Sequence, residues 1–191
     1  MSENVLQTIE GDEVIVEIVH DPDVESPREW HETISTFAFF HRHHKNESDI
    51  KIEGYFESME EFKAHMEITL DKMDAIYLPV YILTHGGSTV ATTPFHCRWD
   101  SGLLGFAYVT RQEARKHWGW KRITKEREET VLRAIKGEVE TYDTYIRGEV
   151  YGYIIKDKEG NQLDSCWEIY GMENCIEQAT EDSHSERVEF A

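Results

Sequence analysis

The sequence predicts an α+β fold, with an antiparallel or mixed sheet and helices packed mainly on one face. Strand-like segments occur in clusters as well as between helical segments, and clustered strands favour antiparallel pairing. The helical segments repeat apolar residues every three or four positions, which gives each an apolar face. At 191 residues the chain is expected to form a single domain over 1–191, with flexible ends at 1–12 and 183–191.

Strands in the first half are indicated by β-branched and aromatic residues. Residues 12–21 alternate apolar and polar side chains, and 33–42 are rich in Thr, Ile and Phe. Residues 75–84 read as a third strand, in which Pro79 indicates an edge or a bulge because proline cannot donate to a ladder. Residues 103–109 predict a buried strand. The intervening residues 85–94 are either a mobile connection or a short strand.

Capping residues mark where helices begin. Ser58 and Glu61 form a capping-box pattern at the start of a helix over 58–73. Thr110 and Glu113 repeat the pattern for a short helix that ends near Trp118.

The second half adds a long helix, a hairpin and a final helix. Thr124 is positioned to cap the long helix, and Gly148 ends it. The hairpin pairs 149–157 with 162–170, which places Tyr151 and Tyr153 on one strand face. A final helix is expected over 172–182.

A net charge of −18 is the strongest compositional feature. It opposes direct binding to nucleic acid and to acidic membranes, and it favours a basic partner. Residues 111–136 reverse the sign, with nine bases against four acids, and interleave Trp118 and Trp120. This basic segment is open to three interpretations: a weak nucleic-acid or phosphate surface, pairing with the chain's own acids, or a contact between copies.

The location is expected to be cytoplasmic. The N-terminus lacks the features of a secretion signal, and no apolar run reaches the roughly 18 residues of a membrane span. Cys97, Cys166 and Cys175 form an odd set without close pairs, which indicates neither a disulfide framework nor a metal ribbon.

The sequence contains residues suited to three kinds of chemistry, and in each case the same residues have a simpler structural explanation. Zinc could bind a set of residues with suitable ligand atoms, but their spacing matches no known site, so no cofactor is expected. This set is His41, His43, His44, His85, His96, Cys97 and Asp100. Cys97 or Cys166 could act as a nucleophile, although a small buried hydrophobe beside Trp explains them better. Residues 84–89 and 100–105 could form anion nests, although turn chemistry explains their glycines better.

Three motifs together resemble a family of uncharacterised proteins carried by bacteriophages, plasmids and other mobile elements. The motifs cover residues 95–175: Cys97, Trp99, Asp100, Ser101, Gly102, Gly105 and Phe106; Glu138 to Tyr142, Asp143, Tyr145, Gly148 and Val150 to Tyr153; Asp164 to Trp167, Tyr170 and Gly171. Relative to that pattern, Glu168 stands where a small residue such as glycine is usual.

Small acidic proteins of such mobile elements often act against the defence systems of the host. The resemblance therefore implies an action against host defence, in the cytoplasm of the host cell if the gene belongs to a phage. The expected function is therefore inhibition of an anti-CRISPR or anti-restriction type, by binding a basic effector, with DNA mimicry as one means. The alternative is a nucleotide or signal-molecule sponge, or a small hydrolase. No catalytic residue is assigned, and whether the protein is an enzyme stays open, with a binding protein favoured. A homodimer is a further option.

The alternative function would use a ligand site built from two similar tetrapeptides, "WDSG" at 99–102 and "DSCW" at 164–167. A sheet could bring them together. The candidate ligand-binding residues are Trp99, Asp100, Ser101, Tyr151, Tyr153, Asp164, Cys166 and Trp167.

Overall fold

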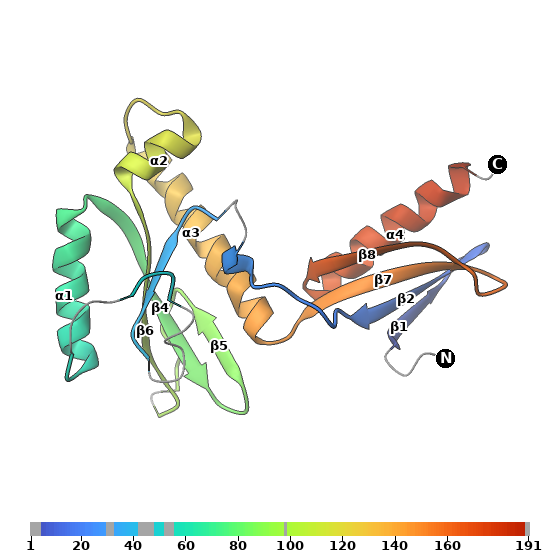
Figure 1. The fold of residues 1–191 in the computed structure, drawn as a ribbon, viewed down its shortest axis with the longest axis horizontal. Coiled ribbons are helices and arrows are strands. Elements are labelled where there is room, and N and C mark those ends of the chain that lie inside the picture. The colour runs from blue at the N-terminus through green and yellow to red at the C-terminus, as the bar shows by residue number, and fades with distance from the viewer. Residues whose placement is uncertain (1–4, 30–32, 42–47, 52–55, 98, 190–191) are drawn as a thin grey trace. The chain divides into compact units, whose positions relative to one another are not determined.

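The strand-like segments form two antiparallel sheets in a computed structural model (Figure 1), which describes residues 5–29, 33–41, 48–51, 56–97 and 99–189. In chain order the elements are β1 (Val5–Glu10), β2 (Val14–His20), η1 (Pro27–Glu29), β3 (Thr36–Phe39), α1 (Met59–Lys72), β4 (Ala75–Thr84), β5 (Ser88–Ala91), β6 (Ser101–Thr110), α2 (Arg111–Trp118), α3 (Lys125–Ile146), β7 (Val150–Asp157), β8 (Gln162–Tyr170) and α4 (Met172–Glu189). The predicted α+β class with antiparallel pairing is confirmed.

The chain divides into two compact units. Unit 1 comprises Met1–Ser26 and Thr144–Ala191, and unit 2 comprises Pro27–Asp143. Each contains one sheet, in the order β1-β2-β7-β8 for unit 1 and β3-β6-β4-β5 for unit 2. The single domain expected over 1–191 stays a prediction, because compact units can fold together or separately.

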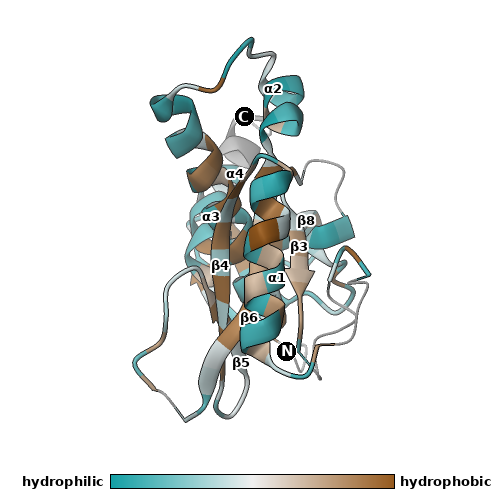
Figure 2. Cartoon of the chain, turned by 90° about the vertical axis from the view of Figure 1, so that its left-hand side faces the viewer, coloured by the Kyte–Doolittle hydropathy of each residue, from teal (hydrophilic) through white to brown (hydrophobic). Residues whose placement is uncertain are grey.

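In unit 2, helices pack on both faces of the sheet. Phe62 of α1 lies 6.3 Å between ring centroids from Phe106 of β6. Figure 2 shows both hydrophilic and hydrophobic residues along α1, and Ile68 of this helix is 57% exposed. On the other face, Tyr142 of α3 meets Phe37 of β3 edge to face, with centroids 5.5 Å apart. Packing on one face, as the sequence predicts, therefore does not describe unit 2.

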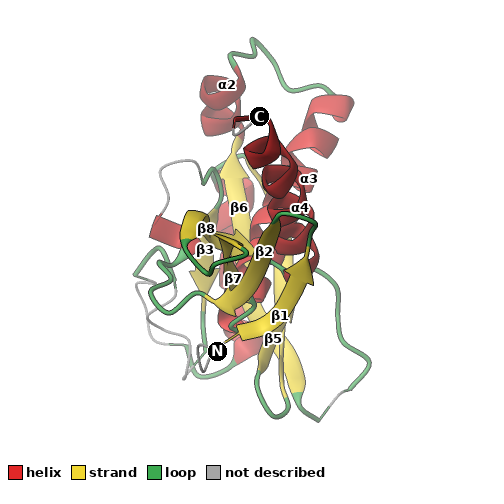
Figure 3. Ribbon diagram, turned by 90° about the vertical axis from the view of Figure 1, so that its right-hand side faces the viewer, coloured by secondary structure: helices red, strands yellow, loops and turns green. Residues whose placement is uncertain are grey.

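In unit 1, α4 covers one face of the sheet (Figure 3). The alternation in β2 directs every second side chain to that face, where β7 adds Tyr151, Tyr153 and Ile155, as predicted. The buried cluster consists of Val14, Val16, Ile18, Tyr151, Tyr153, Ile155, Ile169, Cys175 and Ala179. Here the expected packing on one face holds for the elements described.

The predicted helix starts are confirmed in detail. The Ser58 hydroxyl accepts a hydrogen bond from the Glu61 N–H at 3.1 Å. Thr110 and Glu113 form the reciprocal capping box of α2. Arg127 donates its N–H to the Thr124 hydroxyl at 3.4 Å, at the start of α3.

Several boundaries differ from those predicted. Residues 5–10, expected in a flexible end, form β1, and α4 continues from the expected end at 182 to Glu189. The strand expected over 33–42 is limited to Thr36–Phe39. Pro79 of β4 has a neighbour only in β6, because β5 pairs with β4 only from Tyr81 onward. The ladder register also shifts after Val80, so both features that Pro79 predicts are present.

Candidate functional site

Asp100 organises the corner that leads into β6. Its Oδ2 atom lies 3.1 Å from His85 Nδ1 and 3.6 Å from Cys97 Sγ. Ser101 donates its hydroxyl to the Cys97 carbonyl, and Trp99 stands 96% exposed. Polar side chains and one indole therefore gather at an open turn.

This corner has the wrong order for nucleophilic catalysis. A cysteine nucleophile needs its sulfur against a histidine, with the carboxylate behind the histidine. Here Cys97 and His85 both contact the carboxylate of Asp100, which stands between them. Within the described ranges, no group of three His, Cys, Asp or Glu residues could hold a metal. His43 and His44 of the zinc hypothesis lie outside those ranges.

Tyr151 and Tyr153 belong to the core beneath α4. Tyr153 is fully buried and donates its hydroxyl to Asp182 of α4. Burial, followed by the hydrogen bond to Asp182, raises the pKa of Tyr153. The Tyr151 ring stacks on His20 at 5.0 Å between centroids. Both tyrosines thus have roles in packing and in holding α4.

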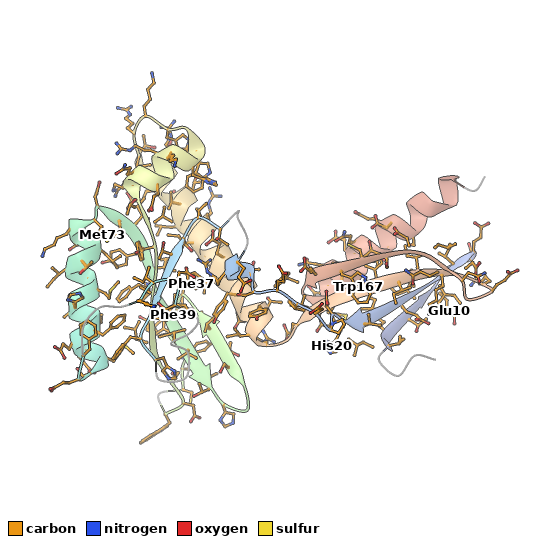
Figure 4. The ribbon with its side chains drawn as sticks, viewed as in Figure 1. Glu10, His20, Phe37, Phe39, Met73 and Trp167 are labelled. Carbon is orange, nitrogen blue, oxygen red and sulfur yellow. The ribbon has the colours of Figure 1, made fainter. Side chains whose placement is uncertain are left out.

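The three candidate residues of β8 serve different faces of the unit 1 sheet. Cys166 pairs with Tyr153 in the ladder and lies 3.7 Å from the Gln178 amide nitrogen of α4. Trp167 lies against Gly152 and is labelled in Figure 4. Asp164 is exposed, and its carboxylate accepts from the Ser165 N–H at 2.8 Å.

The two tetrapeptides, "WDSG" and "DSCW", do not belong to one sheet. Asp100 and Ser101 lead into β6 of unit 2, whereas 164–167 lie in β8 of unit 1. The expectation that a sheet would bring them together is therefore wrong. Their strands pair instead with β3 and β4 in one case and with β7 in the other. The ligand-binding role of these residues stays a prediction.

Many residues of the family-like motifs have structural roles. A Cβ on Gly105 would lie 2.9 Å from the Phe39 Cα atom, so β3 and β6 can approach only with glycine there. Asp143 of α3 accepts the Val90 N–H of β5 at 2.7 Å. The motifs thus describe determinants of this fold better than they describe a reactive site.

A buried ionic cluster around Arg28 was missed by the sequence analysis. The Arg28 side chain is only 9% exposed and contacts Asp49 at 2.6 Å and Glu138 at 3.1 Å. Its guanidinium also lies 3.8 Å from the centre of the Phe37 ring. One signal was visible: Arg28 is the single Lys or Arg in residues 1–30.

Glu138 of α3, a member of this cluster, holds the loop at Ile34 and Ser35 against the helix. Its carboxylate accepts the N–H groups of Ile34 and Ser35 at 2.6 and 3.1 Å, as well as the Ser35 hydroxyl. A cavity of about 170 Å³ lies beside it, lined by Pro27, Arg28, Thr33, Gly137, Glu138 and Thr141. Because the charged groups lining the cavity bond to one another, the cluster acts as a clamp.

The net charge of the chain is divided unequally between the two units. Unit 1 contains 19 acids against four Lys and Arg, a net charge of −15, and unit 2 contains 19 acids against 16, a net charge of −3. Eleven described acids of unit 1 are exposed: Glu10, Asp12, Glu13, Asp23, Glu25, Glu159, Asp164, Glu168, Glu173, Glu177 and Glu181. Most of the acidity is therefore a property of unit 1.

Unit 2 carries one strongly basic surface, here called the basic tip, comprising residues 114–125 at the end of α2 and the loop to α3. These twelve residues contain five bases and no acid. Figures 1 and 2 show this region projecting beyond β6 and hydrophilic over much of its surface. Trp118 and Trp120 stack within it, with ring centroids 4.8 Å apart.

Comparisons with known proteins leave the geometry as the main guide to function. No family model matches the sequence, and no curated protein or solved structure matches it significantly. Among the described residues, no helix is both long and apolar enough to cross a membrane.

Proposed function

We propose that the protein inhibits a host defence system by placing the acidic surface of unit 1 on a basic, nucleic-acid-binding effector, such as a nuclease or a CRISPR effector. The carrying observation is the net charge of −15 on unit 1. A surface of that sign attracts a groove that normally binds phosphates, and it would compete there as a DNA mimic. The resemblance to proteins of mobile elements supports the setting.

The exposed acids of α4 support binding over a purely structural role. Glu173, Glu177 and Glu181 recur at every fourth residue, and all three are exposed. Like charges at this spacing destabilise a helix by about 0.2–0.5 kcal/mol per pair. Their presence on one helix face costs stability, which a binding function would explain.

Glu173, Glu177 and Glu181 lie on the side of α4 that points away from the sheet. Cys175 and Ala179 of α4 are fully buried in the unit 1 core. The acids therefore make no contribution to the core, and they remain available to a partner.

Cleavage assays test the proposal directly. The full chain is titrated against restriction nucleases and CRISPR effectors with their DNA substrates at about 50 mM salt, where screening is weak. Inhibition is expected, and it should weaken as salt rises because the contact is electrostatic. Failure to inhibit or bind any of these effectors at low salt would overturn the proposal.

A matched pair of triple variants separates the surface from total charge. One variant carries Glu173→Gln, Glu177→Gln and Glu181→Gln in unit 1. The other carries Glu60→Gln, Asp71→Asn and Glu129→Gln, which are exposed acids of unit 2. Both change the net charge by three. Only the first should weaken inhibition, and equal loss in both would refute a role for the acidic surface of unit 1.

A further inference from the structure

The cations of the basic tip are exposed and available to an external anion. Among the described residues, no hydrogen bond or ion pair engages the side chains of five of them: Arg115, Lys116, Lys121, Arg122 and Lys125. Pairing with the chain's own acids therefore holds for Arg111 and Lys136 of the basic segment, but not for these five cations.

Two of the acids near the tip are engaged elsewhere. Glu113 completes the capping box of α2. Glu128 pairs with Arg111 at 2.8 Å, and Arg111 also contacts Asp74 at 3.2 Å. Glu126, which directly follows Lys125, and Glu129 are exposed and form no ion pair among the described residues. The acids that flank the tip therefore leave its five cations unpaired.

Aromatic contacts hold the tip in one conformation. The Trp118 and Trp120 rings are nearly parallel, at 11°, and the Arg127 guanidinium lies 5.1 Å from the centre of the Trp120 ring. Arg127 also donates to the Arg122 carbonyl at 2.8 Å. Gly119 adopts the left-handed conformation with φ of 68° that turns the chain after α2. The cations are therefore displayed on an ordered scaffold.

We propose that the basic tip is a nucleic-acid-binding surface that contacts the phosphate backbone without reading bases. The tryptophan rings already contact each other and Arg127, so they serve the scaffold more than base stacking. Five unpaired cations attract the phosphates of a nucleic acid, which bind Lys and Arg by releasing counterions.

The net charge of −18 does not oppose this contact as strongly as the sequence alone suggests. Screening limits electrostatic interactions to about 8 Å at physiological salt. Residues 114–125 carry a local charge of +5, with no acid among them. A phosphate that contacts the tip therefore meets this local positive charge first. This inference requires no effector and stands independently of the proposed function.

Fluorescence anisotropy with labelled DNA tests the inference on the full chain. The probes are a single strand of about 20 nucleotides and a duplex of the same length, between about 50 and 200 mM salt. Five contacts predict a slope of log K against log salt near about −3.5 for the single strand and about −4.5 for the duplex. An absence of binding to both probes at the lowest salt would overturn the proposal.

Two double variants identify the surface. Lys121→Ala with Arg122→Ala should weaken binding about tenfold at low salt and reduce the single-strand slope by about 1.4. Lys51→Ala with Lys72→Ala removes two exposed cations of unit 2 outside the tip and should leave the slope unchanged. Equal losses in the two variants would sink the assignment to the tip.

Light scattering distinguishes a nucleic-acid surface from a contact between copies. At low salt the protein without DNA should show the same mass for the wild type and the tip variant. The contrary outcome is a larger mass for the wild type that the tip variant abolishes and that added DNA does not reverse. It would assign the tip to self-association and would refute the proposal.

Discussion

Trp167 of β8 lies so close to Gly152 of β7 that a Cβ atom at Gly152 would stand 2.8 Å from the indole Cδ2 atom. The ring covers the sheet face opposite α4, and it is 42% exposed. Gly152 is thus required by a close approach between a side chain and the backbone, rather than by a turn.

Gly152→Ala is expected to destabilise the protein by about 1–3 kcal/mol, because the ring must move outward to admit the methyl group. Urea unfolding measures the change. Gly102→Ala is the matched control, since a Cβ there meets nothing within 4 Å. In a protein that already carries Trp167→Ala, Gly152→Ala should cost much less stability than it does in the wild type, because the ring is gone. If the losses of the two single variants simply add in the double variant, the ring is not the cause.

Glu168 holds a left-handed backbone conformation, with φ of 59°. The ladder register also shifts between Tyr151 and Tyr153, opposite this residue. Glycine adopts this conformation without strain, so Glu168→Gly should stabilise the protein by about 0.5–1 kcal/mol. Glu168→Ala retains the strain and serves as control. A thermal melt in which both variants behave alike would contradict this account.

The left-handed conformation gives a physical reason for the glycine that the family-like pattern leads one to expect at 168. The resemblance placed a small residue such as glycine there, and among small residues the backbone favours glycine. Local signals of this kind were readable in the sequence, as were the capping boxes at Ser58 and Thr110. Each depends on a few neighbouring residues, which is why the sequence could predict it.

The division into two sheets depends on long-range pairing that no local signal encodes. β7 pairs with β2, whose residues lie more than a hundred positions earlier in the chain. β1 was missed because its largely exposed residues lack a clear alternation of apolar and polar side chains. The candidate site was predicted wrongly for the same reason, since the similarity of 99–102 and 164–167 gave no information on which sheet each segment joins.

Glu138→Gln should destabilise the protein by about 2–4 kcal/mol, because it removes a carboxylate partner of the largely buried Arg28 and one of the two oxygens that accept backbone N–H groups. Chemical denaturation gives the difference. Glu67→Gln breaks an exposed pair with Lys63 at 3.8 Å and should cost no more than about 0.5 kcal/mol. If the two substitutions cost the same, Glu138 is not a clamp.

Cys175 predicts a specific loss of stability in alkali. Burial, followed by the nearby Cys166, raises the pKa of Cys175 from its ordinary 9.0 to about 11. A raised pKa in the folded state contributes stability that is complete below the unfolded pKa and declines as pH rises from 9.0 toward about 11. The decline can reach about 1.4 kcal/mol per pH unit.

Cys175→Ala should therefore flatten the pH dependence of the free energy of unfolding over that interval, whatever its effect at neutral pH. Cys97→Ala removes an exposed thiol and should leave the pH dependence as it is in the wild type. Parallel curves for wild type and Cys175→Ala would show that the buried thiol does not titrate differently in the folded state.

Glu177 links stability to the proposed function. It stands between Glu173 and Glu181 on α4, so Glu177→Gln relieves two like-charge contacts and should stabilise the protein by about 0.4–1 kcal/mol at low salt. High salt should erase the gain, because screening removes the repulsion. Glu159→Gln changes the net charge equally but lies in the β7–β8 loop, and should bring no comparable gain. If Glu177→Gln also weakens inhibition of an effector, the acids are retained for binding at the expense of stability, whereas a stabilised variant with full inhibition would exclude this helix face from the contact.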